Sequence, residues 1–276
     1  MIVELCKYLF TPCPPGARRL GLLSELIALA ARSRRCAAAW AEHQARCRSL
    51  ILEAAAACPE RRAMLVAGSG LLLELPLAEL AGMFPRVLLC DELHTPAVRR
   101  KVRRLPGVEL VELDLTGLHE AVLALPRGPA GEAAARALAA PRPERFLDRP
   151  DLDLVVSANV LSQLPLAVLG FLGRRFPGIE PAVLDGLGLS IVQAHLAWLS
   201  RFTGRVCLIA DRERLYTDQD RLLAAEDLLH GADLPAGGSE WLWDLAPRPE
   251  AGRDFDVRHR VVGFADLGAA LKPAAG

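Results

Sequence analysis

The chain has 276 residues, its 33 lysine and arginine side chains balance 33 aspartate and glutamate side chains, and 52% of its residues are hydrophobic. This length can bury a large core without disulfides or metals, and the apolar fraction excludes intrinsic disorder. The zero net charge gives no global support for nucleic-acid binding, which usually shows as a basic excess. We expect no transmembrane helix, because no stretch of about 18 uncharged apolar residues is found. Glu4 and Lys7 interrupt the first apolar run, so it does not read as a secretory signal.

The seven cysteines form no Cys-x-x-Cys pair, which argues against a zinc ribbon and a thioredoxin motif. Reduced thiols in a cytoplasmic protein are the simplest interpretation, and we expect no metal site. Cys36, Cys47 and Cys58 are each eleven residues apart, so they would share one helix face as small apolar residues of a packed stripe.

The N-terminal part predicts a helical cap over residues 1–60. Residues 1–16 are expected to be irregular, since the Cys13–Gly16 turn breaks any helix. Residues 17–58 are rich in helix-forming side chains, and two helices that join near residues 32–35 are expected.

From residue 61 short apolar runs alternate with helical segments. The strand-like runs are 63–67, 87–90, 108–113, 152–156 and 206–210, and the helical segments are 71–84, 96–105 and 184–202. This alternation is typical of βαβ units and a parallel sheet. Residues 124–150 interrupt it and are interpreted as an insertion or loop.

Two further strand-like runs, 241–245 and 257–262, follow with only a Pro/Gly-rich turn between them. No helix fits into that connection, so they should pair as an antiparallel hairpin. Trp241 and Trp243 alternate with Leu242 and would face one side of this hairpin, where they could pack on the sheet or mark a dimer edge.

Polar or glycine-rich turns follow the predicted strands. Gly68-Ser69-Gly70 comes after the first strand, where glycines allow a ligand to approach the backbone and a helix from Leu71 would present free N–H groups. Asp91 ends the second strand, Asp114 the third, and Asn159 follows the fourth. In open α/β sheets, ligands bind at the carboxyl ends of the strands. Each feature alone is more often structural, a tight turn or a helix cap, but their joint order and spacing favour a nucleoside site.

This order, with the run Asp-Leu-Val-Val-Ser-Ala-Asn-Val-Leu-Ser-Gln-Leu-Pro at residues 153–165, resembles the class I S-adenosylmethionine-dependent methyltransferases over residues 61–265. The resemblance implies an α/β fold: a Rossmann-like, mostly parallel seven-stranded sheet with a C-terminal antiparallel hairpin and a helical N-terminal cap, the methyltransferase domain spanning 61–276. It implies S-adenosyl-L-methionine as cofactor. It places ten residues at the cofactor: Ala67, Gly68, Ser69 and Gly70 near its amino-acid part, Asp91 and Glu92 at the ribose, Asp114 and Leu115 at the adenine, and Ser157 and Asn159 beside the methyl donor or substrate.

One departure from the family pattern is the missing acid near the end of the first strand, where Met64, Val66 and Ala67 stand. Glu74 is expected one turn into the next helix, pointing away, and is a poor replacement. The alternative function is therefore a catalytically inactive, methyltransferase-like binding or regulatory protein. A nicotinamide oxidoreductase is a third hypothesis, but Leu73 stands where its fingerprint needs a third glycine.

The methyl acceptor is expected to be a small molecule, and no catalytic residue is assigned. Trp40 and His43 lie three residues apart on one helix face and are candidate substrate residues, or anchors of the helix on the sheet. Gln163 and His195 are further substrate candidates near the pocket mouth. The alternatives are that Gln163 only starts a helix and that His195 is a half-buried histidine with a local partner. The basic run 99–104 is interpreted as a solvent-exposed helix or as a binding surface for phosphate or nucleic acid. Membrane and nucleic-acid partners are not expected, and the oligomeric state stays open.

Overall fold

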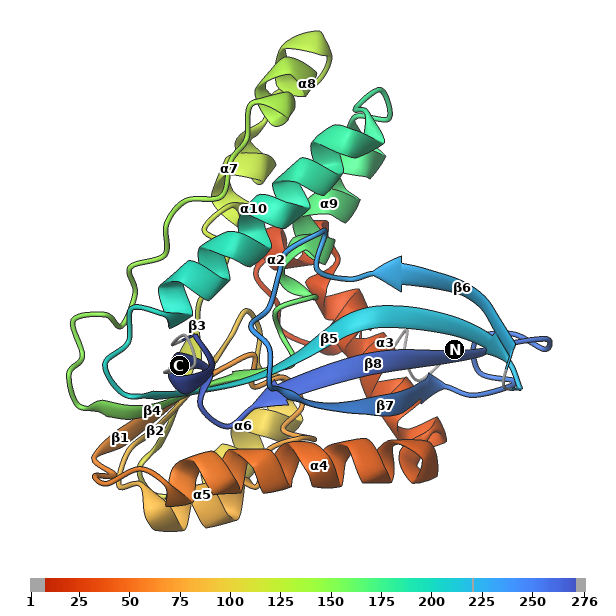
Figure 1. The fold of residues 1–276 in the computed structure, drawn as a ribbon. Coiled ribbons are helices and arrows are strands. Elements are labelled where there is room, and N and C mark those ends of the chain that lie inside the picture. Colours follow the sequence, from red (N-terminus) through yellow and green to blue (C-terminus); the bar gives the residue numbers. More distant parts are fainter. Residues whose placement is uncertain (1–7, 220, 272–276) are drawn as a thin grey trace, which may run out of the picture.

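A computed structural model describes residues 8–219 and 221–271 as a sheet with helices on both faces (Figure 1). Its strands are β1 (Ala63–Ala67), β2 (Val87–Asp91), β3 (Val108–Glu112), β4 (Leu152–Ala158), β5 (Arg205–Asp218), β6 (Arg221–Asp227), β7 (Ser239–Ala246) and β8 (Asp256–Phe264). Its helices are α2 (Pro15–Leu20), α3 (Leu22–Arg35), α4 (Ala37–Ala56), α5 (Leu77–Met83), α6 (Pro96–Val102), α7 (His119–Ala124), α8 (Pro129–Arg136), α9 (Leu164–Arg175), α10 (Pro181–Leu199) and α11 (Leu267–Ala270).

The strand order is β3-β2-β1-β4-β5-β8-β7, and β6 pairs with β5 outside this path. Strands β1 to β5 run parallel, while β8 is antiparallel to both β5 and β7. The predicted closing hairpin is confirmed, with Trp241 opposite Val261. The sheet has eight strands rather than seven, because β5 continues into a second hairpin with β6. Every residue of β6 is exposed, so its sequence carries no inside–outside alternation that could have predicted it.

Alternate side chains of the central strands point to opposite faces of the sheet and pack into two separate hydrophobic cores. On β1, Met64 and Val66 pack with α4, α5 and α6, whereas Leu65 and Ala67 pack with α7, α9 and α10. Figure 1 shows α4 and α5 below the sheet and α9 and α10 above it. The fold is therefore the mixed α/β, Rossmann-like fold that the sequence predicts.

The helix expected at 71–84 begins only at Leu77. Residues 71–76 form an irregular loop in which Leu72 has a φ of +62°, so the idea that a helix from Leu71 offers its free N–H groups to a ligand is wrong. Other helices also differ from the prediction: α2 starts inside the segment that was expected to be irregular, and only the start of α9 was anticipated, by Gln163 as a helix-start residue. The junction of the two N-terminal helices is confirmed, at Cys36.

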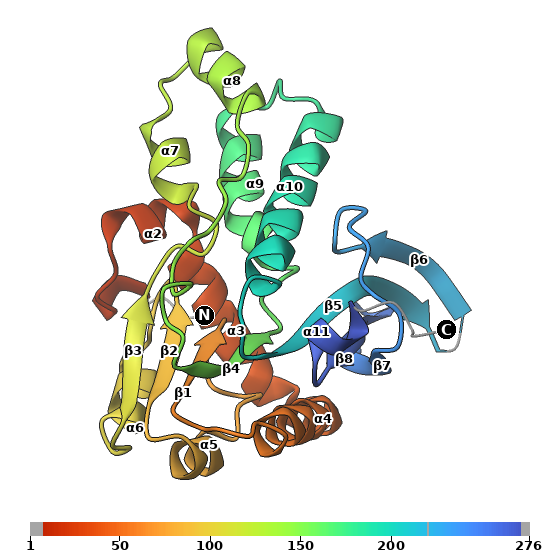
Figure 2. The same cartoon turned by 60° about the vertical axis from the view of Figure 1, so that its left-hand side comes forward.

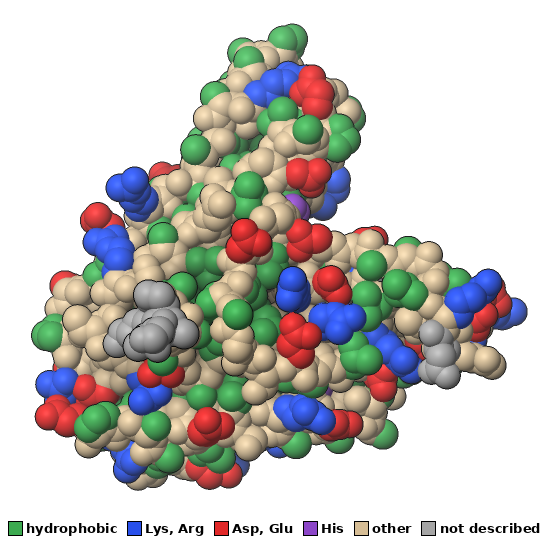
Figure 3. Space-filling view, in the orientation of Figure 1, with side chains coloured by type: hydrophobic (Ala, Val, Ile, Leu, Met, Phe, Trp, Pro, Cys, Tyr) green, Lys and Arg blue, Asp and Glu red, His purple; other side chains and the backbone are tan. Residues whose placement is uncertain are grey.

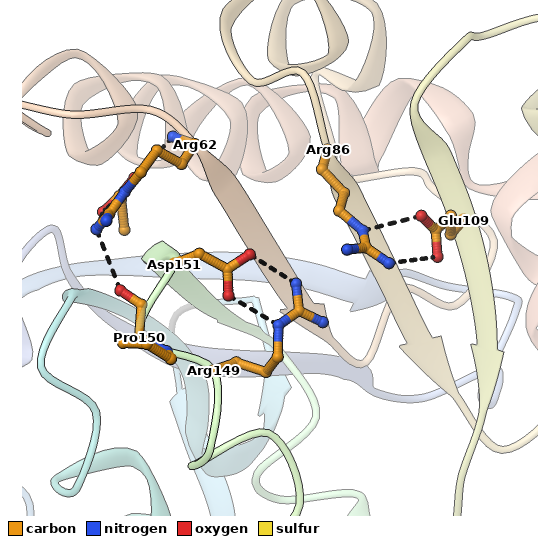
Figure 4. Close-up of polar contacts among 7 residues, drawn as sticks. Arg62, Arg86, Glu109, Arg149, Pro150 and Asp151 are labelled. Carbon is orange, nitrogen blue, oxygen red and sulfur yellow. Dashed lines mark hydrogen bonds and ion pairs between the residues drawn. The ribbon is translucent and has the colours of Figure 1, made fainter.

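Ion pairs and side-chain hydrogen bonds tie the amino ends of the strands together (Figure 4). Arg62, just before β1, donates to the Pro150 carbonyl oxygen (3.1 Å) and to the Asp153 carboxylate at the start of β4 (Nη2–Oδ1 2.6 Å). Arg86 and Glu109 join β2 to β3 in the same way (Nε–Oε1 2.9 Å). These contacts fix the amino edge and leave the carboxyl edge, where loops diverge, for a site.

Two parts project from the sheet, as Figure 2 shows: helices α8, α9 and α10 on one side and the β5–β6 hairpin on the other. Within the described residues one helix, α10, is long and apolar enough to span a membrane, by length and composition only. In the fold it packs on the sheet through residues such as Leu187, Ile191 and Leu199, as a core helix of a globular protein does.

Candidate functional site at the carboxyl edge of the sheet

The sheet order reverses between β1 and β4. From β1 the chain crosses to β2 on one side, and β4 and β5 follow on the other. In open parallel sheets the crevice outside this switch point is the usual place for a ligand. Here the turn 68–70 and the segment 157–160 border it.

The glycine turn after β1 is held by its own hydrogen bonds. Gly68 and Ser69 donate their N–H groups to the Cys90 carbonyl oxygen (3.0 and 3.2 Å). Ser69 Oγ lies 3.2 Å from Nε2 of the buried His94. The turn therefore does not offer these two backbone N–H groups to a ligand.

The two glycines of the turn do different things. Both have positive φ, +79° at Gly68 and +49° at Gly70. A Cβ on Gly68 would lie 2.4 Å from Cβ of Val160, so glycine is required there for β1 and the β4 loop to pack. A Cβ on Gly70 would meet nothing within 4 Å, so this residue faces open space.

Asp91 fixes the turn to the end of β2. Its Oδ2 accepts the Gly70 N–H at 2.6 Å and its Oδ1 accepts the Glu92 N–H at 2.8 Å. Burial raises the pKa of Asp91, and these N–H donors act in the opposite direction. Asp91 is thus a positioning residue for the turn whether or not it also contacts a ligand.

Glu92 is the acid at this edge that is least engaged by the protein. Its Oε1 lies 3.3 Å from Nε2 of His119. Burial raises its pKa well above the usual range, and the neighbouring carboxylates of Asp114 and Asp91 add to the rise. Asp114, in contrast, accepts the N–H groups of Thr116 and His119 (2.8 Å each) and so shapes its own loop. Glu92 is therefore the better acceptor for the hydroxyl groups of a ligand.

Glu92, Asp114 and His119 could each offer one ligand atom to a metal ion, since these atoms lie within 4.8 Å of one another. The spacing is also explained without an ion, because Asp114 caps its loop and His119 contacts Glu92. Asp114 and Leu115 also line a cavity of about 190 Å³ with residues 141–145 and Trp198.

Asn159 stands on the other side of the crevice in the left-handed conformation, with φ +54°. Its N–H donates to the Ile209 carbonyl oxygen (2.9 Å), and its own carbonyl oxygen accepts from Gln163 Nε2 (2.8 Å). Its side-chain Oδ1 is buried and has no hydrogen-bond partner. Buried polar atoms are nearly always satisfied, so this oxygen points to a missing partner.

The predicted substrate residues do not gather in one place. His195 is buried in α10, not at a pocket mouth, and its Nε2 lies 3.0 Å from Ser157 Oγ. Burial lowers the pKa of His195 to about 3, so it is neutral. Trp40 and His43 are buried between α4 and β7, on the opposite face of the sheet.

Residues that the sequence analysis missed include His94, His119, Asp211 and His259. Asp211 and His259 form a buried pair, with Oδ2 2.8 Å from Nδ1. Asp211 could have been singled out from the sequence, since it follows a predicted apolar strand as Asp91 and Asp114 do. His259 could not, because it lies within a strand run. Glu74 was expected one turn into a helix but lies in the loop before α5, and its carboxylate turns toward α4, with Oε1 4.0 Å from His43 Nε2.

No protein-family model and no curated protein matches the sequence. Among solved structures, the chain is similar to the Burkholderia thailandensis 1,6-didemethyltoxoflavin-N1-methyltransferase with bound 1,6-didemethyltoxoflavin and S-adenosylhomocysteine (15% identity, 88% of this chain and 90% of that chain, TM-score 0.32). It is similar to a DhpI-SAM-HEP complex (17% identity, 94% and 89%, TM-score 0.33) and to the N-methyltransferase NodS from Bradyrhizobium japonicum WM9 (11% identity, 80% and 86%, TM-score 0.30).

Proposed function

We propose that the protein is an S-adenosylmethionine-dependent methyltransferase that acts on a small-molecule acceptor. The observation that carries this proposal is the pair of features on either side of the switch point: open space at Gly70 and the unpaired, buried Oδ1 of Asn159. The residues fit a bound nucleoside cofactor, because a ligand between β1 and β4 would fill the first and pair with the second. When bound, such a cofactor supplies an electrophilic methyl group.

The protein's own residues have distinct parts in this proposal. Ala67 to Gly70 form the wall beside the amino-acid end of the cofactor, Glu92 with Asp91 accepts from the ribose hydroxyls, and Leu115 with Asp114 borders the adenine. Asn159 would lie beside the reacting end, and Ser157, which is fully buried with its Oγ 3.0 Å from His195 Nε2, would support the segment from within the core. Placement of the acceptor near the methyl group would supply much of the rate acceleration.

The mixed charge of one face of the molecule argues against a nucleic-acid acceptor there. On the face drawn in Figure 3, acidic and basic side chains are interspersed, and no large patch of one sign is seen. A phosphate backbone would need such a basic patch. We place the protein in the cytoplasm, where its free cysteines would stay reduced.

The second candidate is a catalytically inactive binding or regulatory protein of the same fold. It is favoured by one observation: β1 carries no acid, since Met64, Val66 and Ala67 are all buried apolar residues. In this case the cofactor would bind weakly or not at all, and the crevice would be a remnant.

Titration calorimetry with S-adenosylmethionine and S-adenosylhomocysteine tests the proposal. We expect micromolar binding to the wild type and a loss of about tenfold in Glu92→Gln, the worth of one hydrogen bond. Glu109→Gln, exposed at the opposite edge of the sheet, is the matched control and should bind as the wild type does. A folded protein, free of copurified ligand, that binds neither compound would reject the enzyme and leave the second candidate.

A further inference from the structure

A buried polar cluster lies between α4 and the sheet, beside the proposed cofactor crevice. Its members come from five segments that are far apart in the chain: His43 of α4, Glu74 of the loop after β1, Asp211 of β5, Trp243 of β7 and His259 of β8. Figure 1 shows α4 running beneath β5, β7 and β8. The proposed function uses none of these residues.

Hydrogen bonds fix the protonation of His259. Arg214 donates its Nε–H to His259 Nε2 (3.3 Å), so this nitrogen carries no proton. Nδ1 must then carry the proton and donate it to Asp211 Oδ2 at 2.8 Å. Asp211 is thereby held as an acceptor through one oxygen.

His43 is fixed in a similar way. Trp241 donates its Nε1–H to His43 Nδ1 (3.1 Å), which leaves the proton on Nε2. Burial lowers the pKa of His43 to about 4, so the ring is neutral at neutral pH. It stacks on Trp243 with ring centroids 4.0 Å apart, and Trp243 meets His259 edge-on at 5.7 Å.

Two atoms of this ordered cluster have no partner. Asp211 Oδ1, an acceptor, and Trp243 Nε1, a donor, are buried and make no hydrogen bond, in residues that are 2% and 3% exposed. The neighbouring His43 and His259 rings are held by hydrogen bonds from Trp241 and Arg214 and to Asp211, so loose packing does not explain the two gaps. The carboxylate oxygen needs a hydrogen-bond donor and the indole N–H needs an acceptor.

The cluster lies next to the β4 side of the crevice. Asp211 lies two residues beyond Ile209, which pairs with the last residue of β4 and accepts the Asn159 N–H. Glu74 lies four residues after Gly70 and is 21% exposed. Burial is the main cause of the raised pKa of Glu74, and the Asp211 carboxylate adds to the rise.

We propose that Asp211 Oδ1 and Trp243 Nε1 form the subsite that binds the reacting group of the acceptor, and that this group carries an N–H or O–H. The proposal rests on the proposed function for the identity of the occupant. It excludes acceptors without such a proton, such as thioethers and tertiary amines, because they would leave the buried carboxylate oxygen unpaired. Asp211 Oδ1 would contact the reacting group directly, while His259 and Arg214 act as positioning residues.

The test uses imidazole, which has one N–H donor and one nitrogen acceptor, and 1-methylimidazole, which keeps the acceptor but lacks the donor. Both are titrated at a pH where imidazole is uncharged, into protein with ¹⁵N-labelled tryptophan indoles. The Trp243 indole N–H signal, assigned with Trp243→Phe, reports binding. We expect imidazole to shift this signal and to bind at least about tenfold more tightly than 1-methylimidazole.

Asp211→Asn gives a readout that a purely structural role would not produce. The His259 Nδ1–H still needs an oxygen, so the asparagine amide would turn its Oδ1 to His259 and its NH₂ toward the free position. The free group would change from acceptor to donor, and the preference for imidazole over 1-methylimidazole should be lost. The exposed Asp233→Asn is the matched control and should keep it.

Equal binding of the two probes to the wild type, an unchanged preference in Asp211→Asn, or no shift of the Trp243 signal would each overturn the subsite. Calorimetry with S-adenosylmethionine on the same samples separates this failure from that of the proposed function. Cofactor binding without probe discrimination rejects only the subsite. Discrimination without cofactor binding leaves a ligand subsite and rejects the methyltransferase.

Discussion

The backbone N–H of Gly70 donates to Oδ2 of Asp91 at 2.6 Å and thereby joins the turn after β1 to the end of β2. Asp91, which the sequence suggests as a ligand contact, is therefore also part of the framework that shapes the crevice. Variants of Asp91 will change both the fold and the ligand affinity, so their effects must be separated by measuring both.

Asp91→Asn should destabilise the protein by about 1–3 kcal/mol, because one of its two buried N–H partners would face an amide NH₂ instead of an oxygen. Urea unfolding, followed by circular dichroism, measures this loss. Glu92→Gln is the comparison, since no backbone N–H donates to the Glu92 side chain within the described residues, and it should lose less stability. Equal losses in the two variants would contradict the framework role of Asp91.

Substitution of the two glycines should separate packing from conformation. Gly68→Ala places a Cβ at 2.4 Å from Val160 in a left-handed residue, and about 2–4 kcal/mol of stability should be lost. Gly70→Ala adds a Cβ in open space and should cost only the conformational part, about 1–2 kcal/mol.

The double variant Gly68→Ala/Val160→Gly checks the cause of this difference, because only glycine removes the Val160 Cβ that lies 2.4 Å away. Removal of the valine side chain should restore part of the loss, as measured by thermal unfolding. A double variant no more stable than expected from the sum of the single changes would show that Val160 is not the obstacle.

Glu74 should make the protein less stable as the pH rises. Burial raises the pKa of its carboxyl group from 4.5 to about 7, so the folded protein binds this proton more tightly than the unfolded chain. The contribution of Glu74 to the free energy of unfolding is fully present below pH 4.5. It is lost as the pH rises through about 7, a change of roughly 3 kcal/mol. His43 acts in the opposite direction, since its pKa is lowered to about 4 and its contribution is lost as the pH falls from 6.5.

The difference in unfolding free energy between the wild type and Glu74→Gln isolates the glutamate, because the histidines cancel. This difference should decrease between pH 4.5 and 7 and stay constant above. Glu79→Gln, an exposed change on α5, should give a difference that does not depend on pH. A flat profile for Glu74→Gln would mean that Glu74 is solvated rather than buried against α4.

The parallel half of the sheet could be predicted because its strands, apart from β3 with Glu109 and Glu112, are mainly apolar runs that stop at a polar or glycine-rich turn. The apolar run predicted at 63–67 is strand β1, and all five of its residues are buried. The loop 71–76 could not be predicted in this way. Its leucines give a helical pattern, but Pro76 and tertiary contacts of Leu72 and Leu75 keep the segment out of a helix.

The sequence predicted which residues end the strands, but not how their side chains are used. Asp114 and Asp91 both occupy the expected positions, yet their carboxylates accept backbone N–H groups from neighbouring turns. The cluster around Asp211 was beyond reach for a different reason. It depends on side chains from strands that are paired only after the β5–β8 register is set, with Arg214 opposite His259.

The central claim is that a nucleoside cofactor lies between the carboxyl ends of β1 and β4. A crystal structure of the protein with S-adenosylhomocysteine tests it most directly. We predict ligand density against Gly70, a hydrogen bond from the ligand to Asn159 Oδ1, and ribose hydroxyls within reach of Glu92. Density at another place, or an empty crevice at saturating ligand concentration, would contradict the account.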